Sequence, residues 1–316
     1  MEDRYSFLEW ASESGMDATE MLPADLAAIR SRVFTWYEHN QRSIPWRQTT
    51  DPYHITVAEV MSQQTQIARV IQPYERFITK WPTVEALAAT ALAEVVSFWS
   101  DHSLGYNTRA RYLHELATIV VDEYQGEFPE TPDELCELPG IGPYTANAVA
   151  SFAFNSGNGV VDTNVKRILF RAFSVPDKTN AYQEAADVLL PEGHSRTWNN
   201  AIMELGGTVC QKQPTCDEDA CPLRQWCQAY AAGDFQAPDV PRQSSFSGSR
   251  RQYRGRIIRE LSGNDEYLLD ELGPRIRADY TPEDDHEWLL GILEDLESDG
   301  LLSIDDSDDG LRLTLA

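Results

Sequence analysis

The chain has 316 residues and a net charge of −25, which arises from 51 acidic residues against 22 arginines and four lysines. No run of eighteen apolar residues occurs, which excludes a transmembrane helix, and the acidic start lacks the basic and apolar segments of a secretory signal, so we expect a cytoplasmic protein. The charge is the reverse of that of most nucleic-acid-binding proteins, and it is typical of adaptation to a high-salt cytoplasm.

Residues 1–24 are predicted to form a poorly ordered tail, and residues 25–235 an all-helical domain. Apolar residues at three- and four-residue spacing, typical of helices packed on a core, occur in the segments 25–40, 52–81, 83–100 and 107–124. Thr131-Pro132-Asp133-Glu134 marks the start of a further helix, because it combines a capping side chain, a first-turn proline and an acid three residues after the cap.

Glu59 is an acid among apolar neighbours in the second of these segments, Thr56-Val57-Ala58-Glu59-Val60-Met61. Burial among such neighbours raises the pKa of a carboxyl group, so Glu59 is a candidate proton donor. Taken alone, the residue would be better explained as an exposed helix glutamate.

The segment Leu138-Pro139-Gly140-Ile141-Gly142 predicts a tight turn between two helices. Glycines permit the sharp turn, and the amide N–H groups at the start of the second helix can bind a phosphate. Asp162 follows about twenty residues later, at the predicted start of another helix, where N–H groups and the helix dipole should favour its charged form. The simpler alternative is a glycine-rich connection followed by a capping aspartate.

Four cysteines, Cys210, Cys216, Cys221 and Cys227, are separated by five, four and five residues. Disulfides are improbable in a cytoplasmic protein, so we expect a metal site. Structural zinc usually uses closely spaced cysteine pairs, whereas the wider gaps suit a [4Fe–4S] cluster; zinc is kept as the alternative. The fifth cysteine, Cys136, is expected to be a small buried apolar residue.

Residues 236–250 have the composition of a linker, and residues 251–316 are predicted to form a small winged-helix-like α+β domain. Its helices are expected at 254–263, 266–276 and 284–301, and a β-hairpin at 301–316. Two uses of this acidic module stay open, a protein partner or a further DNA contact. The latter would involve four arginines on its first helix, Arg251, Arg254, Arg256 and Arg259.

The hairpin and downstream acid resemble those of the helix-hairpin-helix DNA glycosylases, and further motifs between residues 32 and 227 resemble the MutY-type adenine DNA glycosylases. These motifs are Ile44–Arg47, Asp51–Tyr53, Glu59–Gln66, Leu104–Tyr106, Arg109–Arg111 and Met203–Gly206. The resemblance implies a mainly α fold, the helix-hairpin-helix DNA glycosylase fold with a [4Fe–4S] cluster loop at 210–227. It also implies removal of adenine opposite guanine or 8-oxoguanine in double-stranded DNA.

Excision of a base needs a proton on the leaving group and stabilisation of an oxocarbenium-like sugar. The resemblance implies that Glu59 supplies the proton and later activates water, that Asp162 stabilises the sugar, and that Tyr144 and Asn164 hold this network. The adenine pocket would be lined by Trp46, Arg47 and Glu204. The DNA would be contacted by the turn Gln63, Gln64 and Thr65, by Tyr106, and by the backbone clamp at Leu138, Gly140 and Gly142.

In this resemblance Gln64 and Tyr106 enter the base stack, although Trp46 and Tyr106 could each be ordinary core aromatics. Related enzymes with lyase activity carry a lysine nucleophile where this chain has Tyr144, so no lyase step is expected. The alternatives are a thymine glycosylase acting on T·G mispairs and a non-catalytic DNA-binding regulator. The chain departs from the family at Asn107, at Thr163, in the spacing of its middle cysteines, and in residues 251–316.

Overall fold

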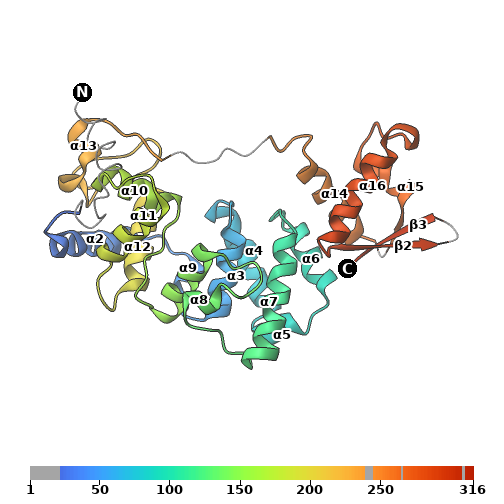
Figure 1. The fold of residues 1–316 in the computed structure, drawn as a ribbon, viewed down its shortest axis with the longest axis horizontal. Coiled ribbons are helices and arrows are strands. Elements are labelled where there is room, and N and C mark those ends of the chain that lie inside the picture. Colours follow the sequence, from blue (N-terminus) through green and yellow to red (C-terminus); the bar gives the residue numbers. More distant parts are fainter. Residues whose placement is uncertain (1–21, 239–244, 265, 308–309) are drawn as a thin grey trace. The chain divides into compact units, whose positions relative to one another are not determined.

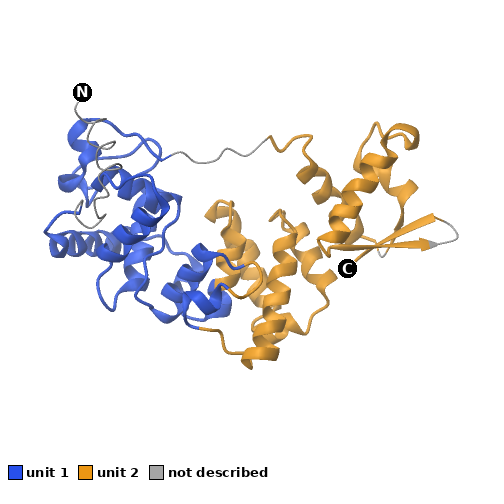
Figure 2. Cartoon of the chain, viewed as in Figure 1, with its two compact units in different colours: residues 1–55, 130–136, 141–241 blue, residues 56–129, 137–140, 242–316 orange. Residues whose placement is uncertain are grey.

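The computed structural model describes residues 22–238, 245–264, 266–307 and 310–316 (Figure 1). The predicted tail at 1–24 therefore lies almost wholly outside the described residues. Contacts divide the chain into two compact units (Figure 2), the first made of residues 1–55, 130–136 and 141–241, the second of 56–129, 137–140 and 242–316. Within the described ranges, no helix is both long and apolar enough to cross a membrane.

The first unit is helical throughout its described part. Its elements are α2 (Leu26–Asn40), the 3₁₀ helix η2 (Pro45–Gln48), α8 (Pro132–Leu135), α9 (Pro143–Phe154), α10 (Thr163–Phe173), α11 (Thr179–Leu189), α12 (Ser195–Thr208), the 3₁₀ helix η3 (Arg224–Trp226) and α13 (Gln228–Ala232). The core forms where α2, α10, α11 and α12 bury their apolar faces together, with Ile29, Ile168, Tyr182 and Trp198 among the buried side chains. The start of α10 and the end of α12 therefore both belong to the first unit and its core.

The predicted helix starts are confirmed by their caps. Thr131 Oγ1 accepts from the Glu134 amide, as a capping side chain does, and donates to the Glu134 carboxylate at 2.6 Å. Asp51, which directly precedes α3 (Pro52–Ser62) earlier in the chain, accepts from the Tyr53 amide at 2.8 Å. Capping hydrogen bonds of this kind join residues no more than three positions apart, so they form independently of how distant parts of the chain pack.

Two segments of the second unit, 52–81 and 83–100, each show a single run of apolar spacing in the sequence, but each forms two helices. Its elements before the C-terminal module are α3 (Pro52–Ser62, whose first turn belongs to the first unit), α4 (Ile67–Lys80), α5 (Val84–Ala88), α6 (Leu92–Asp101) and α7 (Thr108–Tyr124). The break between α3 and α4 contains Gln64 in the left-handed conformation, with φ +53°. Phe77 and Trp81 pack on Phe98 at ring-centroid distances of 5.3 Å each, which fastens α4 to α6.

The C-terminal module has the predicted three helices and hairpin, together with one strand that was not predicted. Its elements are α14 (Arg250–Ser262), β1 (Tyr267–Leu268), α15 (Leu269–Ile276), α16 (Pro282–Ser298), β2 (Leu302–Ser307) and β3 (Gly310–Leu315). The antiparallel sheet has the order β1-β3-β2, and Leu313 of β3 pairs with both Tyr267 and Ile304. A two-residue strand shows no alternation in sequence, so β1 forms only because β3 is beside it.

Candidate active site and cluster loop

Asp162 caps α10 and is held by three hydrogen bonds. Its Oδ1 accepts from the amides of Asn164 and Val165 at 2.8 and 2.7 Å, and its Oδ2 accepts from Asn164 Nδ2 at 2.8 Å. Burial nevertheless raises the pKa of Asp162, although these hydrogen bonds and the nearby charge of Arg167 lower it. The expectation that the helix start would favour the charged form is therefore wrong in its net effect, because loss of solvation outweighs the donors.

A chain of hydrogen bonds joins Asp162 to the first cluster cysteine. Arg167 Nη2 donates to Asn164 Oδ1 at 2.7 Å, which turns the Asn164 amide nitrogen toward Asp162, and Arg167 Nε donates to the Cys210 carbonyl at 2.6 Å. The same guanidinium donates to the Gly206 carbonyl. A Cβ at Gly206 would lie 2.6 Å from the Asn164 Cβ, so the close approach of α12 to the start of α10 requires glycine.

Glu204 is fully buried on α12 between two arginines. Arg42 Nε and Nη2 bind its carboxylate at 2.6 and 3.0 Å, and Arg47 Nη1 lies 2.8 Å from its Oε2. Burial raises the pKa of Glu204, but the hydrogen bond from Arg42 and the charge of Arg47 outweigh it, so the pKa is lowered and the group stays ionised. The structure thus brings together Arg47 and Glu204, the two charged residues expected in the adenine pocket, with Trp46 half-buried beside Arg47 in η2.

Glu59 and Tyr144 lie in different units and are described separately. Glu59 is 7% exposed on α3, between Ala58 and Val60, which are also buried, so the alternative of an exposed helix glutamate is wrong. Tyr144 is half-buried in the first turn of α9.

The expected DNA-contacting residues of the second unit are organised around Arg109. Its Nη1 donates to the Gln63 carbonyl at 2.7 Å, and its guanidinium carbon lies 4.5 Å from the Tyr106 ring centroid. Gln64 and Tyr106 both have positive φ, +53° and +49°, which costs energy in residues other than glycine and is common at functional sites. Tyr106 is 38% exposed, so the alternative that it is a core aromatic is wrong.

The glycine turn before α9 has the expected form. Leu138 is buried, and Gly140 has φ +74°. A Cβ at Gly140 would lie 2.7 Å from the Tyr112 Cβ, so glycine is required there both for conformation and for space. Gly142 is the N-cap of α9 and is exposed, as a backbone clamp for a phosphate needs to be.

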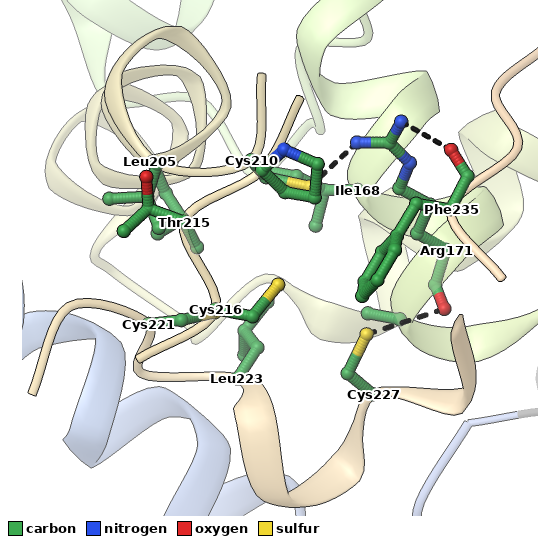
Figure 3. A pocket seen from close by; sticks show the side chains of 13 residues that line it. Ile168, Arg171, Leu205, Cys210, Thr215, Cys216, Cys221, Leu223, Cys227 and Phe235 are labelled. Carbon is green, nitrogen blue, oxygen red and sulfur yellow. Dashed lines mark hydrogen bonds between the residues drawn. The ribbon is translucent and has the colours of Figure 1, made fainter. Parts of the chain in front are cut away.

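The four cysteines at positions 210, 216, 221 and 227 line one pocket with apolar neighbours that include Ile168 and Leu223. Figure 3 shows the sulfurs of Cys210, Cys216 and Cys227 around this space. Among the described residues, no carboxylate or imidazole lines the pocket. Burial raises the pKa of the Cys216 and Cys227 thiols and raises that of Cys221 to about 11. Thiols gathered in an apolar pocket are suited to a metal cofactor, whose charge would favour their ionised form.

The pocket is closed on one side by Arg171 of α10. Its guanidinium donates to the Gln211, Phe235 and Gln236 carbonyls at 2.6 to 2.8 Å, and its Nη1 lies 3.7 Å from Cys210 Sγ (Figure 3). The fifth cysteine, Cys136, was expected to be buried and is instead exposed at the C-cap of α8. A single residue at a helix end carries no periodic signal for its face, so the sequence could not decide its exposure.

Three arginines of the site were missed by sequence reasoning. Arg42 reaches a glutamate that is 162 positions away in the chain, and nothing near it in the sequence indicates this. Arg167 and Arg171 did carry a signal, because two basic residues at i and i+4 lie on one face of a helix that also packs on a core. Their partners are carbonyl oxygens of the cluster loop, which no sequence pattern marks.

Comparison with known proteins places the chain in a defined group. The HhH-GPD superfamily model, described as base excision DNA repair protein, matches residues 57–191. The adenine DNA glycosylase of Mycolicibacterium smegmatis is 39% identical over 253 residues, which cover 78% of this chain and 82% of that protein. The adenine DNA glycosylase of Rattus norvegicus is 41% identical over 223 residues, 66% of this chain but only 42% of that longer protein. The solved structure of a thermostable thymine-DNA glycosylase matches with a TM-score of 0.60 at 29% identity, over 66% of this chain and 100% of that one.

Proposed function

Because the chain belongs to the adenine DNA glycosylase family, within the HhH-GPD superfamily of base excision DNA repair proteins, we propose that it removes adenine mispaired with guanine or 8-oxoguanine from double-stranded DNA. The chain is a DNA N-glycosylase by its family. The opposite base and the absence of a lyase step are the finer parts of the proposal. The observation that carries it is the half-buried carboxylate of Asp162, which caps α10 and accepts a hydrogen bond from Asn164 Nδ2, in a chain whose relatives are adenine glycosylases.

Two carboxyl groups divide the chemistry. Glu59, buried among apolar neighbours, protonates the leaving adenine and then helps to activate water. Asp162 stabilises the positive charge that develops on the sugar, and this charge in turn favours the ionised form of a carboxyl group whose pKa burial has raised. Tyr144 and Asn164 hold the acid and water network. Because Tyr144 offers no amine, the reaction ends with hydrolysis and no Schiff base forms.

The base leaves the stack before it is cut, and the flipped adenine is received by Trp46, Arg47 and Glu204. Extrusion costs a few kcal/mol of stacking, which side chains that fill the gap help to offset. Gln64 and Tyr106 are the residues that enter the stack. The exposed turns that carry them, and the glycine turn at Gly140, supply a DNA-contacting surface that does not depend on lysines.

A [4Fe–4S] cluster, held by Cys210, Cys216, Cys221 and Cys227, is the cofactor that the pocket fits best. Among the described residues, no group of three or more Cys, His, Asp or Glu side chains is already placed to hold a metal ion, so the proposal rests on the four thiols that line one pocket and on their wide spacing in the sequence. Arg171, beside Cys210 Sγ, would offset part of the negative charge of the ligands. The cluster would have a structural role and shape the loop. Iron and acid-labile sulfide, with absorbance in the visible blue, would support it; stoichiometric zinc would contradict it.

The test is base release from a panel of duplexes with A·G, A·8-oxoguanine, T·G and A·T pairs at high salt. We expect alkali-labile sites in the adenine strand of the first two only, and no strand breakage without alkali. Glu59→Gln and Asp162→Asn should each slow release by about a thousandfold, in the range of acid–base catalysis. Glu38→Gln, an exposed acid on α2, should be active. Full activity of either catalytic-site variant would contradict the assignment, and cleavage in the thymine strand would support the T·G alternative.

A further inference from the structure

The C-terminal module belongs to the same compact unit as the turn that carries Tyr106 (Figure 2). Its first helix, α14, packs against α6, which precedes that turn (Figure 1). A second contact involves Gly300, which has φ +61° and whose Cβ, if present, would lie 3.1 Å from Arg111 Cδ on α7. The module is thus seated on both helices that flank residues 102–107.

Arg251, in the first turn of α14, reaches the phenol of Tyr106. Its Nη1 donates to the Tyr106 hydroxyl at 2.6 Å, and its guanidinium carbon lies 5.8 Å from the ring centroid. Arg109 approaches the same ring at 4.5 Å. A hydrogen bond from a charged donor is stronger than one between neutral groups, so Arg251 restricts the far end of the tyrosine side chain.

The near end of the side chain is restricted by the backbone. Gly105 and Tyr106 are both left-handed, with φ +68° and +49°, and Trp99 Nε1 donates to the Gly105 carbonyl at 2.8 Å. The ring is therefore held at its backbone and at its hydroxyl while 38% of the residue remains exposed. A side chain oriented before binding loses less conformational entropy when it binds.

We propose that Arg251 is a positioning residue for Tyr106, through which the C-terminal module sharpens the preference for mispaired over paired adenine. The inference rests on the proposed function, in which Tyr106 enters the base stack. A mispair opens at lower cost than a Watson–Crick pair, so a pre-oriented tyrosine strengthens binding most at the mispair, where its ring enters the base stack most easily. A phosphate contact by Arg251 would instead strengthen binding to every duplex alike, since phosphate contacts carry no sequence information.

The experiment is a double-mutant cycle on DNA binding with the full-length protein. The quantity measured is the ratio of Kd for an A·T duplex to Kd for the same duplex with one A·G mispair, in a Glu59→Gln background that prevents base loss. Arg251→Met and Tyr106→Phe should each lower this ratio by about fivefold, the effect of one hydrogen bond. The double variant should lower it no further than either single change, because both remove the same interaction.

Arg275→Met is the matched control, since it removes one exposed arginine of the same module that pairs with Glu260. It should leave the ratio unchanged. Arg251→Lys keeps a charged donor, so its ratio of Kd values should lie between those of the wild type and Arg251→Met. If the melting temperature shows that Arg251→Met does not fold, the ratio of Arg251→Lys tests the positioning role in its place.

Two results would overturn the positioning role: additive effects in the double variant, or an unchanged ratio in Arg251→Met. If the ratio is unchanged because Arg251→Met weakens binding to both duplexes equally, a phosphate contact is indicated. A wild-type protein that releases no adenine from the A·G duplex would contradict the proposed function instead. Adenine release with additive variants would contradict the positioning role alone.

Discussion

Two carboxyl groups of the first unit, Glu204 and Asp162, have opposite pKa shifts because their partners differ in charge. Glu204 is faced by the guanidinium groups of Arg42 and Arg47, and its pKa is lowered despite burial. Asp162 is faced mainly by neutral N–H donors, and burial raises its pKa. A full positive charge in contact offsets the loss of solvation, whereas amide dipoles do so only in part.

The raised pKa of Asp162 predicts the acid side of the pH–rate profile. In the proposed mechanism, base release needs Asp162 ionised and Glu59 protonated, so the single-turnover rate should rise as pH falls and then drop once Asp162 takes up a proton. That drop should be centred above pH 3.8, the ordinary aspartate pKa. Single-turnover rates at saturating enzyme measure it, and Glu38→Gln should not move it. A rate that still rises at pH 4 would contradict the assignment.

At the scale of elements, α10 joins Asp162 to the loop that carries the four cysteines. Asp162 caps its first turn, and Arg167 and Arg171, one helical turn apart, both bind carbonyls of the segment that carries the cysteines. The position of the loop therefore depends on one face of one helix. The planar fork of arginine is what allows a single side chain to satisfy several carbonyls at once.

Arg171→Lys is expected to loosen the cluster loop. The lysine ammonium is a point donor and cannot reproduce the bonds to Gln211, Phe235 and Gln236, so these partly buried carbonyls lose a charged donor at a cost of about 2 kcal/mol in the free energy of unfolding. Denaturant unfolding and bound iron per chain measure the effect, and both should fall. Arg69→Lys, at an exposed arginine on α4, is the control. Wild-type stability and iron content in Arg171→Lys would show that the loop keeps its position without the hydrogen bonds of Arg171.

At the scale of the whole molecule, the net charge of −25 acts against the compact state. Carboxylates spread over the surface repel one another, and salt reduces this repulsion because the screening length falls from about 10 Å at 0.1 M to about 3 Å at 1 M. The C-terminal module also carries an excess of carboxylates. Most of its arginines are already paired with acidic residues, as Arg250 is with Asp295 and Arg312 with Glu266.

The melting temperature should therefore rise as KCl increases from about 0.1 M to about 1 M. NaCl should act in the same way, because screening depends on ionic strength and not on the identity of the cation. Differential scanning calorimetry at fixed pH measures the shift. A melting temperature that is flat or falls over this range would mean that repulsion between surface carboxylates contributes little to stability.

The sequence by itself determined the features that depend on neighbours within a few residues. Helix periodicity, the caps at Thr131 and Asp162, the glycine turn at Gly140 and the C-terminal hairpin are all confirmed, because each is a local hydrogen-bonding or packing preference. The apolar neighbours of Glu59 left both a buried and an exposed side chain open, and the structure decided for burial.

Only the tertiary structure decided which distant groups meet. It paired Glu204 with Arg42, joined Arg167 to the cluster loop, built β1 against β3, exposed Cys136, and brought Arg251 of the C-terminal module to Tyr106. It also reversed the expected shift at Asp162, since the cap is visible in the sequence but the enclosure of the carboxylate is not. The physical reason is that solvation and long-range contacts belong to the packed chain, whereas caps and periodicity belong to the local segment.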